Sequence, residues 1–143
     1  MKALTLSQPW ATLVALGAKR IETRSWFTTY RGRLAIQASS HITKEAIAIC
    51  WHPLYRAALE AAGYIATSGP PDNPFNLPIG AVLAIVTLVD MQRINVENVP
   101  GEPEYSFGDY TPGRYAWYLE DVYRLPDPIP AKGRLGLFTI DGL

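Results

Sequence analysis

The chain has 143 residues, 48% of them hydrophobic, and its 13 basic residues balance 13 acidic residues so that the net charge is zero. This length suits one domain with a substantial core, which we expect to span residues 1–143, and the neutral charge excludes a general polyanion binder. The single cysteine, Cys50, excludes an internal disulfide and a cysteine-rich zinc site. We expect no cofactor, metal or membrane partner, and the lack of a secretory signal or a membrane-spanning run indicates a cytoplasmic protein.

The charge is unevenly distributed along the chain. Residues 1–33 carry six basic residues and one acidic residue, whereas residues 34–143 carry seven basic and twelve acidic residues. A local basic patch near the N-terminus is therefore compatible with zero overall charge. The alternative is that these basic side chains are scattered over a solvated face.

The first elements are a strand and a short helix. Residues 2–6 predict a strand, and Ser7 is a candidate N-cap for a helix whose first turn tolerates Pro9. Apolar residues at helical spacing from Trp10 predict one buried helix face. Gly17 predicts the end of this helix, since glycine accepts a left-handed conformation there.

A charged strand is predicted over residues 19–24. Alternation places Arg20, Glu22 and Arg24 on one face, and Lys19 stands at the entrance of the strand. A row of fixed charge at the mouth of a sheet suits an anionic or highly polar ligand. Neighbouring cations would lower the pKa of Lys19 and make it usable as a base. The alternative is a surface ion-pair ladder of little energetic value.

The rest of the chain predicts a mixed α+β fold. Thr43 is a candidate N-cap for a helix to about residue 51, and a second helix, which His52 would cap, runs from Pro53 to Gly63. Apolar runs predict further strands over residues 33–39, 81–89, 114–125 and 136–140.

Three segments between these elements are predicted to lack helix and regular strand. Residues 67–78 predict an irregular surface loop, and residues 90–112 predict a long polar loop over the mouth of a barrel. The prolines at 126, 128 and 130 predict an extended connector after the strand that ends at residue 125.

Six short motifs in a fixed order carry a family resemblance. They are Ser7-Gln8-Pro9-Trp10-Ala11, Gly17-Ala18-Lys19, Glu22-Thr23-Arg24-Ser25-Trp26, Tyr30-Arg31-Gly32-Arg33-Leu34-Ala35-Ile36, Tyr115-Ala116-Trp117-Tyr118-Leu119-Glu120-Asp121-Val122 and Lys132-Gly133-Arg134-Leu135-Gly136-Leu137-Phe138. Together they resemble the ASCH domain family, a branch of the PUA-like superfamily. The resemblance implies a small, mostly antiparallel PUA-like β-barrel with peripheral helices.

The same resemblance implies RNA-related roles. ASCH proteins include coactivator-type binding modules and nucleic-acid binders, and some small bacterial members hydrolyse N4-acylated cytidines with a Lys–Thr–Glu set or act as ribonucleases. Lys19 matches the catalytic lysine, but Glu22 stands at the threonine position and Thr23 follows it. We assign Lys19, Glu22 and Thr23 as candidate catalytic residues, while Glu102 or Glu104 matches the family glutamate by position only.

A second group of residues forms the candidate ligand-binding set. The turn at Ser7 and Gln8 exposes backbone N–H groups to an anionic oxygen, and Arg24 can hold Glu22 while offering a second edge to ligand. Trp10 either stacks on a base or belongs to the core.

An aromatic and arginine-rich segment follows the charged strand. Trp26, Tyr30 and Arg31 combine rings for bases with a cation for phosphate, or else pack a turn. In the acidic loop, a carboxylate such as Asp109 either reaches the Lys19 site or is simply solvated.

We therefore expect an RNA- or modified-nucleotide-binding protein with a basic cleft at the barrel mouth. The alternative is a nucleoside amidohydrolase or a ribonuclease with Lys19 as the base, so the partner is RNA, single-stranded nucleic acid or a modified nucleoside. In either case Lys19, Glu22 and Arg24 should line one cleft together with Ser7 or Gln8.

Overall fold

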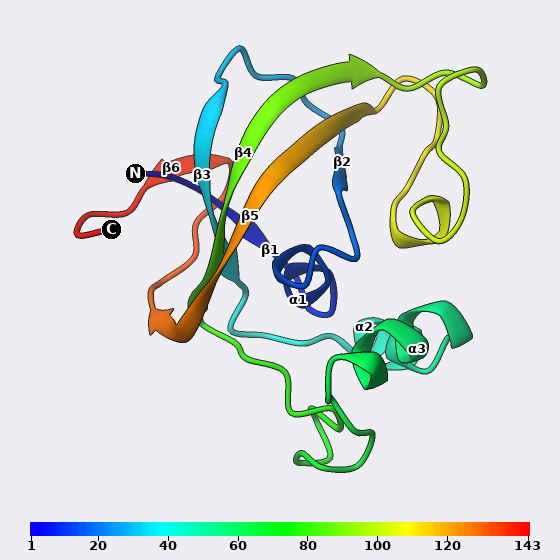
Figure 1. Ribbon diagram of the computed structural model, residues 1–143, viewed down its shortest axis with the longest axis vertical. Helices are drawn as coiled ribbons and strands as arrows, with labels where there is room; N and C mark the ends of the chain where they lie inside the picture. The colour runs from blue at the N-terminus through cyan, green and yellow to red at the C-terminus, as the bar shows by residue number, and fades with distance from the viewer.

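The computed structural model describes residues 1–143 and contains one six-stranded sheet with the strand order β2-β5-β4-β3-β1-β6 (Figure 1). All neighbouring strands are antiparallel except β1 and β3. The strands are β1 (Lys2–Leu6), β2 (Ile21–Arg24), β3 (Gly32–Ala38), β4 (Ala81–Arg93), β5 (Tyr115–Pro130) and β6 (Leu137–Thr139). The helices are α1 (Trp10–Ala15), α2 (Lys44–Cys50), α3 (Pro53–Ala61) and the short 3₁₀ helix η1 (Tyr105–Phe107). The predicted α+β fold is confirmed.

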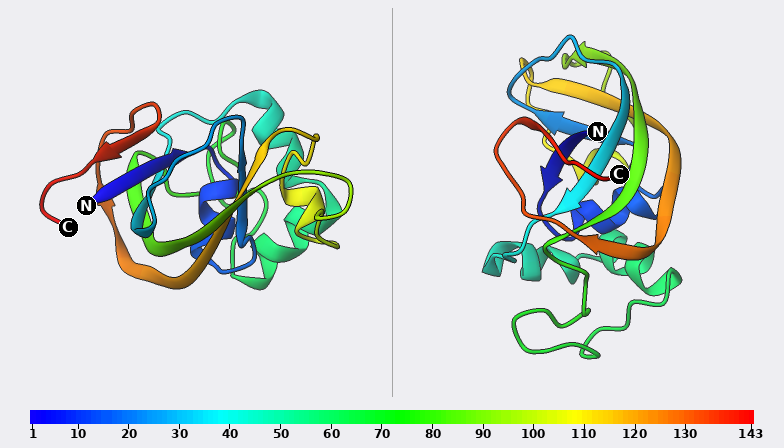
Figure 2. Two further views of the ribbon diagram at one scale, coloured as in Figure 1. Left: turned by 90° about the horizontal axis from the view of Figure 1, so that it is seen from above. Right: turned by 90° about the vertical axis from the view of Figure 1, so that its left-hand side faces the viewer.

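The two long strands β4 and β5 give the sheet its curvature. Their pairing contains three register shifts, between Val82 and Ala84, between Ile85 and Thr87, and between Leu88 and Asp90. Such bulges bend a strand and increase its twist. Figure 2 shows β4 and β5 curving around α1, so the sheet forms a half-barrel with the helices α2 and α3 at one end.

Strand β5 is longer than its sequence predicts. It continues through Pro126 and Pro128 to Pro130, which pairs with Ala81. On its other side β5 pairs with β2 only as far as Tyr118, so its second half is an edge. Because proline lacks an N–H donor, it is tolerated in such an edge position. Strand β4 likewise runs to Arg93, where polar residues pair with the start of β5.

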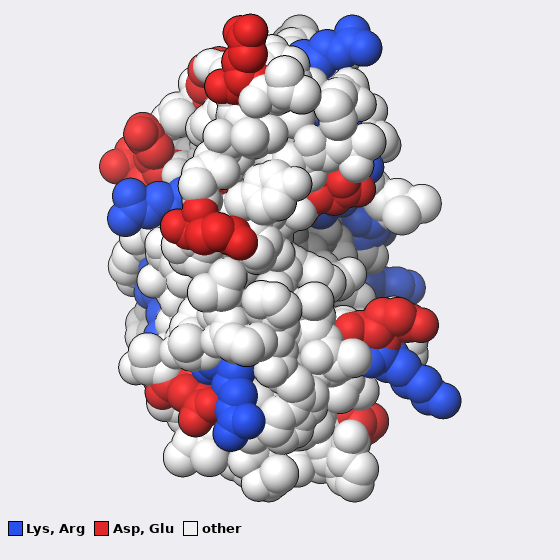
Figure 3. Space-filling model, turned by 90° about the vertical axis from the view of Figure 1, so that its right-hand side faces the viewer, with Lys and Arg blue, Asp and Glu red and all other residues white.

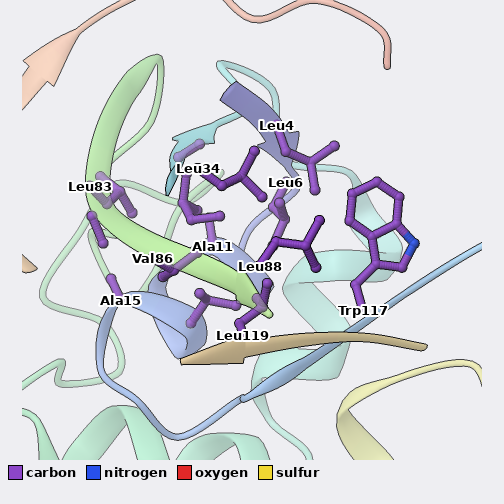
Figure 4. Close-up of a cluster of buried hydrophobic side chains, with 14 of the residues drawn as sticks. Leu4, Leu6, Ala11, Ala15, Leu34, Leu83, Val86, Leu88, Trp117 and Leu119 are labelled. Carbon is purple, nitrogen blue, oxygen red and sulfur yellow. The ribbon is translucent and has the colours of Figure 1, made fainter. Parts of the chain in front are cut away.

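The main core lies between the concave face of the sheet and α1 (Figure 4). Leu4, Leu34, Val86 and Trp117 contribute to it from four different strands, and the small residues of α1, such as Ala11, allow close packing. A second cluster joins α1 to α3 and η1, and its members include Leu13, Tyr55, Leu59, Phe75 and Phe107. Residues 94–114, which connect β4 to β5 and contain η1, form the η1 loop. The second cluster holds this loop against the helices and thereby shapes the candidate site.

The predicted caps are correct for two of the three helices. Thr43 Oγ1 accepts a hydrogen bond from Ala46 N at 3.1 Å, and His52 Nδ1 accepts one from Leu54 N at 3.2 Å. The predicted Ser7 cap of α1 is wrong, since Pro9 occupies the N-cap position without a side-chain bond and Gln8 Oε1 accepts from Thr12 N instead. None of the helices is long and apolar enough to cross a membrane.

Candidate functional site

A polar cleft of about 580 Å³ opens between β2, the start of α1, the two other helices and the η1 loop. Its lining residues are Thr5, Ser7, Trp10, Glu22, Thr23, Arg24, Ile49, Tyr55, Ser106, Phe107, Gly108, Asp109 and Arg114. These residues come from segments more than a hundred positions apart in the sequence. The cleft therefore exists only because the η1 loop folds back over β2.

Arg24 is fixed in the cleft by three hydrogen-bonding contacts. Its Nε donates to Glu22 Oε2 at 3.0 Å, its Nη2 lies 2.9 Å from the same oxygen, and Nη2 also donates to Thr5 O at 2.8 Å. Its Nη1 has no hydrogen-bond partner in the protein, and the side chain is 25% exposed. The guanidinium is thus held in place while one N–H edge stays available to a ligand.

Lys19 lies beneath the cleft and is fully buried. Its Nζ donates to Ile21 O at 2.6 Å and to Phe107 O at 2.9 Å, and it lies 3.7 Å from Glu22 Oε1. All three neighbours are acceptors, so this geometry suits a protonated ammonium. The buried lysine thereby ties β2 to the η1 loop.

The pKa of Lys19 is lowered chiefly by its burial, and the carboxylates of Glu22 and Glu104 oppose this effect. From the sequence, a lowered pKa of Lys19 was expected from the neighbouring cations. The positive charge of Arg24 does act in that direction, but its contribution is the smallest of the causes. The predicted position of Lys19 at the entrance of the strand did not indicate that its side chain would be buried.

A second fixed guanidinium enters the cleft from the segment before β5. Arg114 Nη2 donates to Thr23 O at 3.2 Å, its Nε donates to Asp109 O at 3.2 Å, and Nε lies 3.5 Å from Asp109 Oδ2. Its Nη1 has no hydrogen-bond partner in the protein, and its side chain is 29% exposed. Arg114 was not a predicted site residue, and no sequence motif marks it.

Thr23 joins β2 directly to the η1 loop. Its Oγ1 accepts a hydrogen bond from Asp109 N at 3.0 Å. The neighbouring Gly108 packs so tightly that an added Cβ would lie 2.9 Å from the Tyr110 ring and 3.2 Å from Thr23 Cγ2. Glycine is therefore needed for this close approach.

Two aromatic side chains form another wall of the cleft. Trp10 Nε1 donates to Tyr55 Oη at 3.2 Å, and Tyr55 Oη donates to Ser106 O at 2.7 Å. The two rings meet edge to face, with 6.2 Å between their centroids. Trp10 is half-buried, so it packs against both core clusters and also presents part of its surface to the cleft. Tyr55 was not a predicted site residue.

The cleft carries both signs of charge. Each arginine is accompanied by a carboxylate, Glu22 for Arg24 and Asp109 for Arg114. Hydrogen bonds from Thr111 lower the pKa of Asp109, which favours its charged form. Figure 3 shows Lys and Arg interspersed with Asp and Glu on one face of the molecule, without a large area of one sign. The predicted basic cleft is therefore a mixed one.

The remaining predicted site residues lie outside the cleft. Gln8 is buried, and its Nε2 donates to Pro78 O at 2.6 Å. Trp26 packs edge to face on Trp117 with 4.8 Å between ring centroids. The Tyr30 hydroxyl donates to Arg33 O, and Arg31 Nη1 donates to the carbonyl oxygens of residues 28 and 30. Ligand binding by Trp26, Tyr30 and Arg31 stays a prediction.

The two glutamates matched by position hold the loop itself. Glu104 accepts hydrogen bonds from Arg20 N at 2.7 Å and Ile21 N at 3.4 Å, and burial raises its pKa. Glu102 accepts from the backbone N–H and the hydroxyl of Ser106. Neither lines the cleft. No group of three or more His, Cys, Asp or Glu side chains lies close enough together to hold a metal ion.

The fold and the cleft define a small α+β protein with a curved half-barrel and a polar site beside its edge strand. The sequence model of the ASCH domain family matches residues 4–126, and the chain belongs to this family, as its motifs predicted.

Known relatives are similar to the chain in sequence, and solved structures are similar to it in fold. The chain is 34% identical over 87 residues to activating signal cointegrator 1 of Homo sapiens and of Mus musculus. The match covers 61% of this chain but only 14% of each of these longer relatives. The crystal structure of ASCH from Zymomonas mobilis is similar with a TM-score of 0.55 and 14% identity, over 97% of this chain and 86% of that one. A variant of that protein gives the same TM-score with 15% identity, over 97% of this chain and 88% of the variant.

Proposed function

We propose that the cleft binds one nucleotide unit of single-stranded RNA, or a free modified nucleotide. The observation that carries this proposal is the pair of anchored guanidiniums, Arg24 and Arg114, each with Nη1 free of protein partners. Guanidinium N–H groups held in a fixed orientation bind phosphate or carbonyl oxygens with little further loss of side-chain entropy.

The size and the walls of the cleft support a ligand of this class. A volume of about 580 Å³ corresponds to about twenty water volumes, which matches the number of non-hydrogen atoms in one nucleotide. Trp10 offers an apolar ring surface for a base, and the exposed hydroxyl of Ser7 can bind a polar edge of the base or the ribose. A duplex does not fit such a cleft, whereas an unstacked nucleotide does.

The mixed charge of the surface predicts a weak dependence on salt. Two phosphate contacts on a single strand would give a slope of log K against log salt of about −1.4. Binding across an extended basic face would give a much steeper slope. The salt series therefore distinguishes cleft binding from generic attraction to a polyanion.

The test is a fluorescence-anisotropy titration of labelled single-stranded RNA and duplex RNA, with cytidine monophosphate as competitor. We expect single strands to bind, the mononucleotide to compete, and Arg114→Gln to weaken binding at least about tenfold through the loss of a charge-assisted contact. Arg33→Gln removes an equally charged but exposed residue outside the cleft and should leave affinity unchanged. Equal losses for both variants, or failure of the mononucleotide to compete, would refute the proposal.

Hydrolysis of an acylated nucleoside or of RNA is a second candidate, favoured by one observation. Lys19 has a lowered pKa and lies 3.7 Å from Glu22, which lines the cleft beside Thr23. For Lys19 to act as a base, its amine must lose a proton and its lone pair must reach the cleft, but the side chain is fully buried beneath Phe107, so the η1 loop must move. Catalysis therefore requires a conformational change that binding does not.

Turnover of N4-acetylcytidine and of single-stranded RNA, followed by product separation, tests this second candidate. Wild type, Glu22→Gln and Lys19→Met are compared, with thermal denaturation as the control for folding. Product from the wild type and none from a folded Glu22→Gln variant would support hydrolysis. If the wild type gives no product, both hydrolytic reactions are excluded, and nucleotide binding is the only proposed function that is left.

A further inference from the structure

A second cavity of about 300 Å³ shares no lining residue with the cleft. Its walls come from α1, from β4, from the second half of β5 and from the connection that precedes β4. On α1 it is lined by Thr12 and Ala15, whereas the cleft is lined by Trp10. Because Trp10 and Thr12 are two positions apart on a helix, they face nearly opposite directions. Helix α1 therefore separates the polar cleft from the second cavity.

Arg124 lines this cavity, and its positive charge is not paired with a carboxylate. The side chain of this β5 residue donates from Nη2 to Tyr64 Oη at 3.0 Å, and no carboxylate lies within 4.0 Å of its guanidinium. Its Nε and Nη1 have no hydrogen-bond partner in the protein. Arg124 is exposed, and the phenol of Tyr64 orients its guanidinium without cancelling its charge, so an anion entering the cavity would meet free N–H donors.

The other walls are apolar, with one buried hydroxyl. Leu83, Leu125 and Pro126 provide carbon surface for the body of a ligand. Thr12 is only 1% exposed, and its Oγ1 has no hydrogen-bond partner in the protein. A buried hydroxyl without a partner is costly, and a polar atom of a ligand that reaches Thr12 would supply the missing bond.

We infer that this cavity binds a small organic carboxylate with a compact apolar body. The volume equals about ten water volumes and so accommodates about ten non-hydrogen atoms. One arginine matches a single negative charge, and the apolar walls match a ring or short chain rather than a fully solvated polyanion. A ligand of this size in a partly open cavity should have a dissociation constant on the order of 1 mM.

The test is a titration of the ¹⁵N-labelled protein with benzoate and with its uncharged isostere benzamide, followed by two-dimensional NMR. Benzoate should shift the amide signals of Thr12, Leu83 and Leu125 in a saturable way, while the cleft signals of Thr23 and Gly108 stay unchanged. Benzamide should bind at least about tenfold more weakly, because it lacks the charge that Arg124 recognises. Equal binding of both compounds, or benzoate shifts confined to the cleft, would overturn the inference.

Three variants of exposed residues complete the test. Arg124→Gln should abolish the benzoate shifts, whereas Arg124→Lys should retain weaker binding because the charge remains. Arg134→Gln removes an exposed arginine that does not line the cavity, and it should bind like the wild type. Undiminished benzoate binding by Arg124→Gln would refute the assigned recognition. The expected shifts and the Arg124 variants concern residues outside the cleft, so this inference can be tested independently of nucleotide binding.

Discussion

The cleft beside β2 and the connection between β2 and β3 contain similar residue types but differ in what their polar groups do. In the cleft, Arg24 and Arg114 are each held by several acceptors and keep one N–H edge free. In the connection, Arg31 Nη1 donates to two carbonyl groups one and three positions before it in the chain, and its guanidinium lies over the Phe27 ring. Arginines near aromatic residues therefore indicate a ligand-binding site only where a cleft lies beside them.

The same contrast holds for buried and exposed cations. Lys19 and Arg31 both donate to two backbone carbonyl oxygens, but Lys19 is fully buried and Arg31 is exposed. A buried carbonyl or carboxylate that loses its donor cannot turn to water instead, whereas an exposed one can. The comparison predicts very different costs for two matched substitutions.

The largest effect is expected for Lys19→Met. Methionine preserves most of the side-chain volume, but it leaves Ile21 O and Phe107 O without their buried donor and removes the cation beside Glu22, so the free energy of unfolding should fall by about 3 kcal/mol. Arg31→Met should change it by less than about 0.5 kcal/mol. Urea denaturation of both variants measures the difference. Similar values for the two would show that Lys19 does not hold the η1 loop to β2.

A smaller effect is expected for Gly108→Ala. The added Cβ would lie 2.9 Å from the Tyr110 ring and 3.2 Å from Thr23 Cγ2, and such overpacking should cost about 2 kcal/mol. Gly101→Ala, on the same loop, meets no atom within 4 Å and should be nearly neutral. Thermal denaturation of both variants provides the measurement. An unchanged melting temperature for Gly108→Ala would mean that the loop moves freely relative to β2.

The smallest effect concerns the pH dependence of Glu104. Burial raises its pKa above the usual 4.5, so the folded protein holds a proton that the unfolded chain releases. The contribution of Glu104 to the free energy of unfolding therefore falls as the pH rises through and above 4.5. Glu104→Gln keeps an acceptor for Arg20 N but cannot ionise, so its stability relative to the wild type should increase from pH 4 to neutral pH.

Urea denaturation of the wild type and Glu104→Gln across this pH range provides the check. A constant difference between the two curves would show that Glu104 titrates alike in the folded and unfolded chains.

The family and most of the elements could be predicted because their signals are local. Thr43 and His52 mark the starts of α2 and α3 through bonds to residues two or three positions away. The charged pair Glu22 and Arg24 follows from the alternation of a strand, and it does line the cleft. The order of short motifs was sufficient to identify the ASCH family.

The composition of the cleft could be predicted only in part. Ser7, Trp10, Glu22, Thr23 and Arg24 line it, whereas Tyr55, Ser106 and Arg114 had no signal in the sequence. Tyr55 lies on a helix whose apolar spacing indicates packing, and its role depends on Trp10 and Ser106. Arg114 follows an ordinary loop, and its position depends on bonds to Thr23 and Asp109.

The sequence by itself determined the α+β character, the family and the caps of α2 and α3, because each depends on residues a few positions apart. Only the tertiary structure decided that Lys19 is buried, that β5 continues through its prolines and that Arg114 enters the cleft. The physical reason is that these features depend on distant partners: Lys19 donates to the carbonyl of Phe107, 88 positions away, and the prolines of β5 are tolerated because β2 ends its pairing at Tyr118. Local sequence patterns do not identify such distant partners. The burial of Lys19 and the edge position of the β5 prolines therefore depend on the curvature of the sheet and on the packing of the η1 loop over β2.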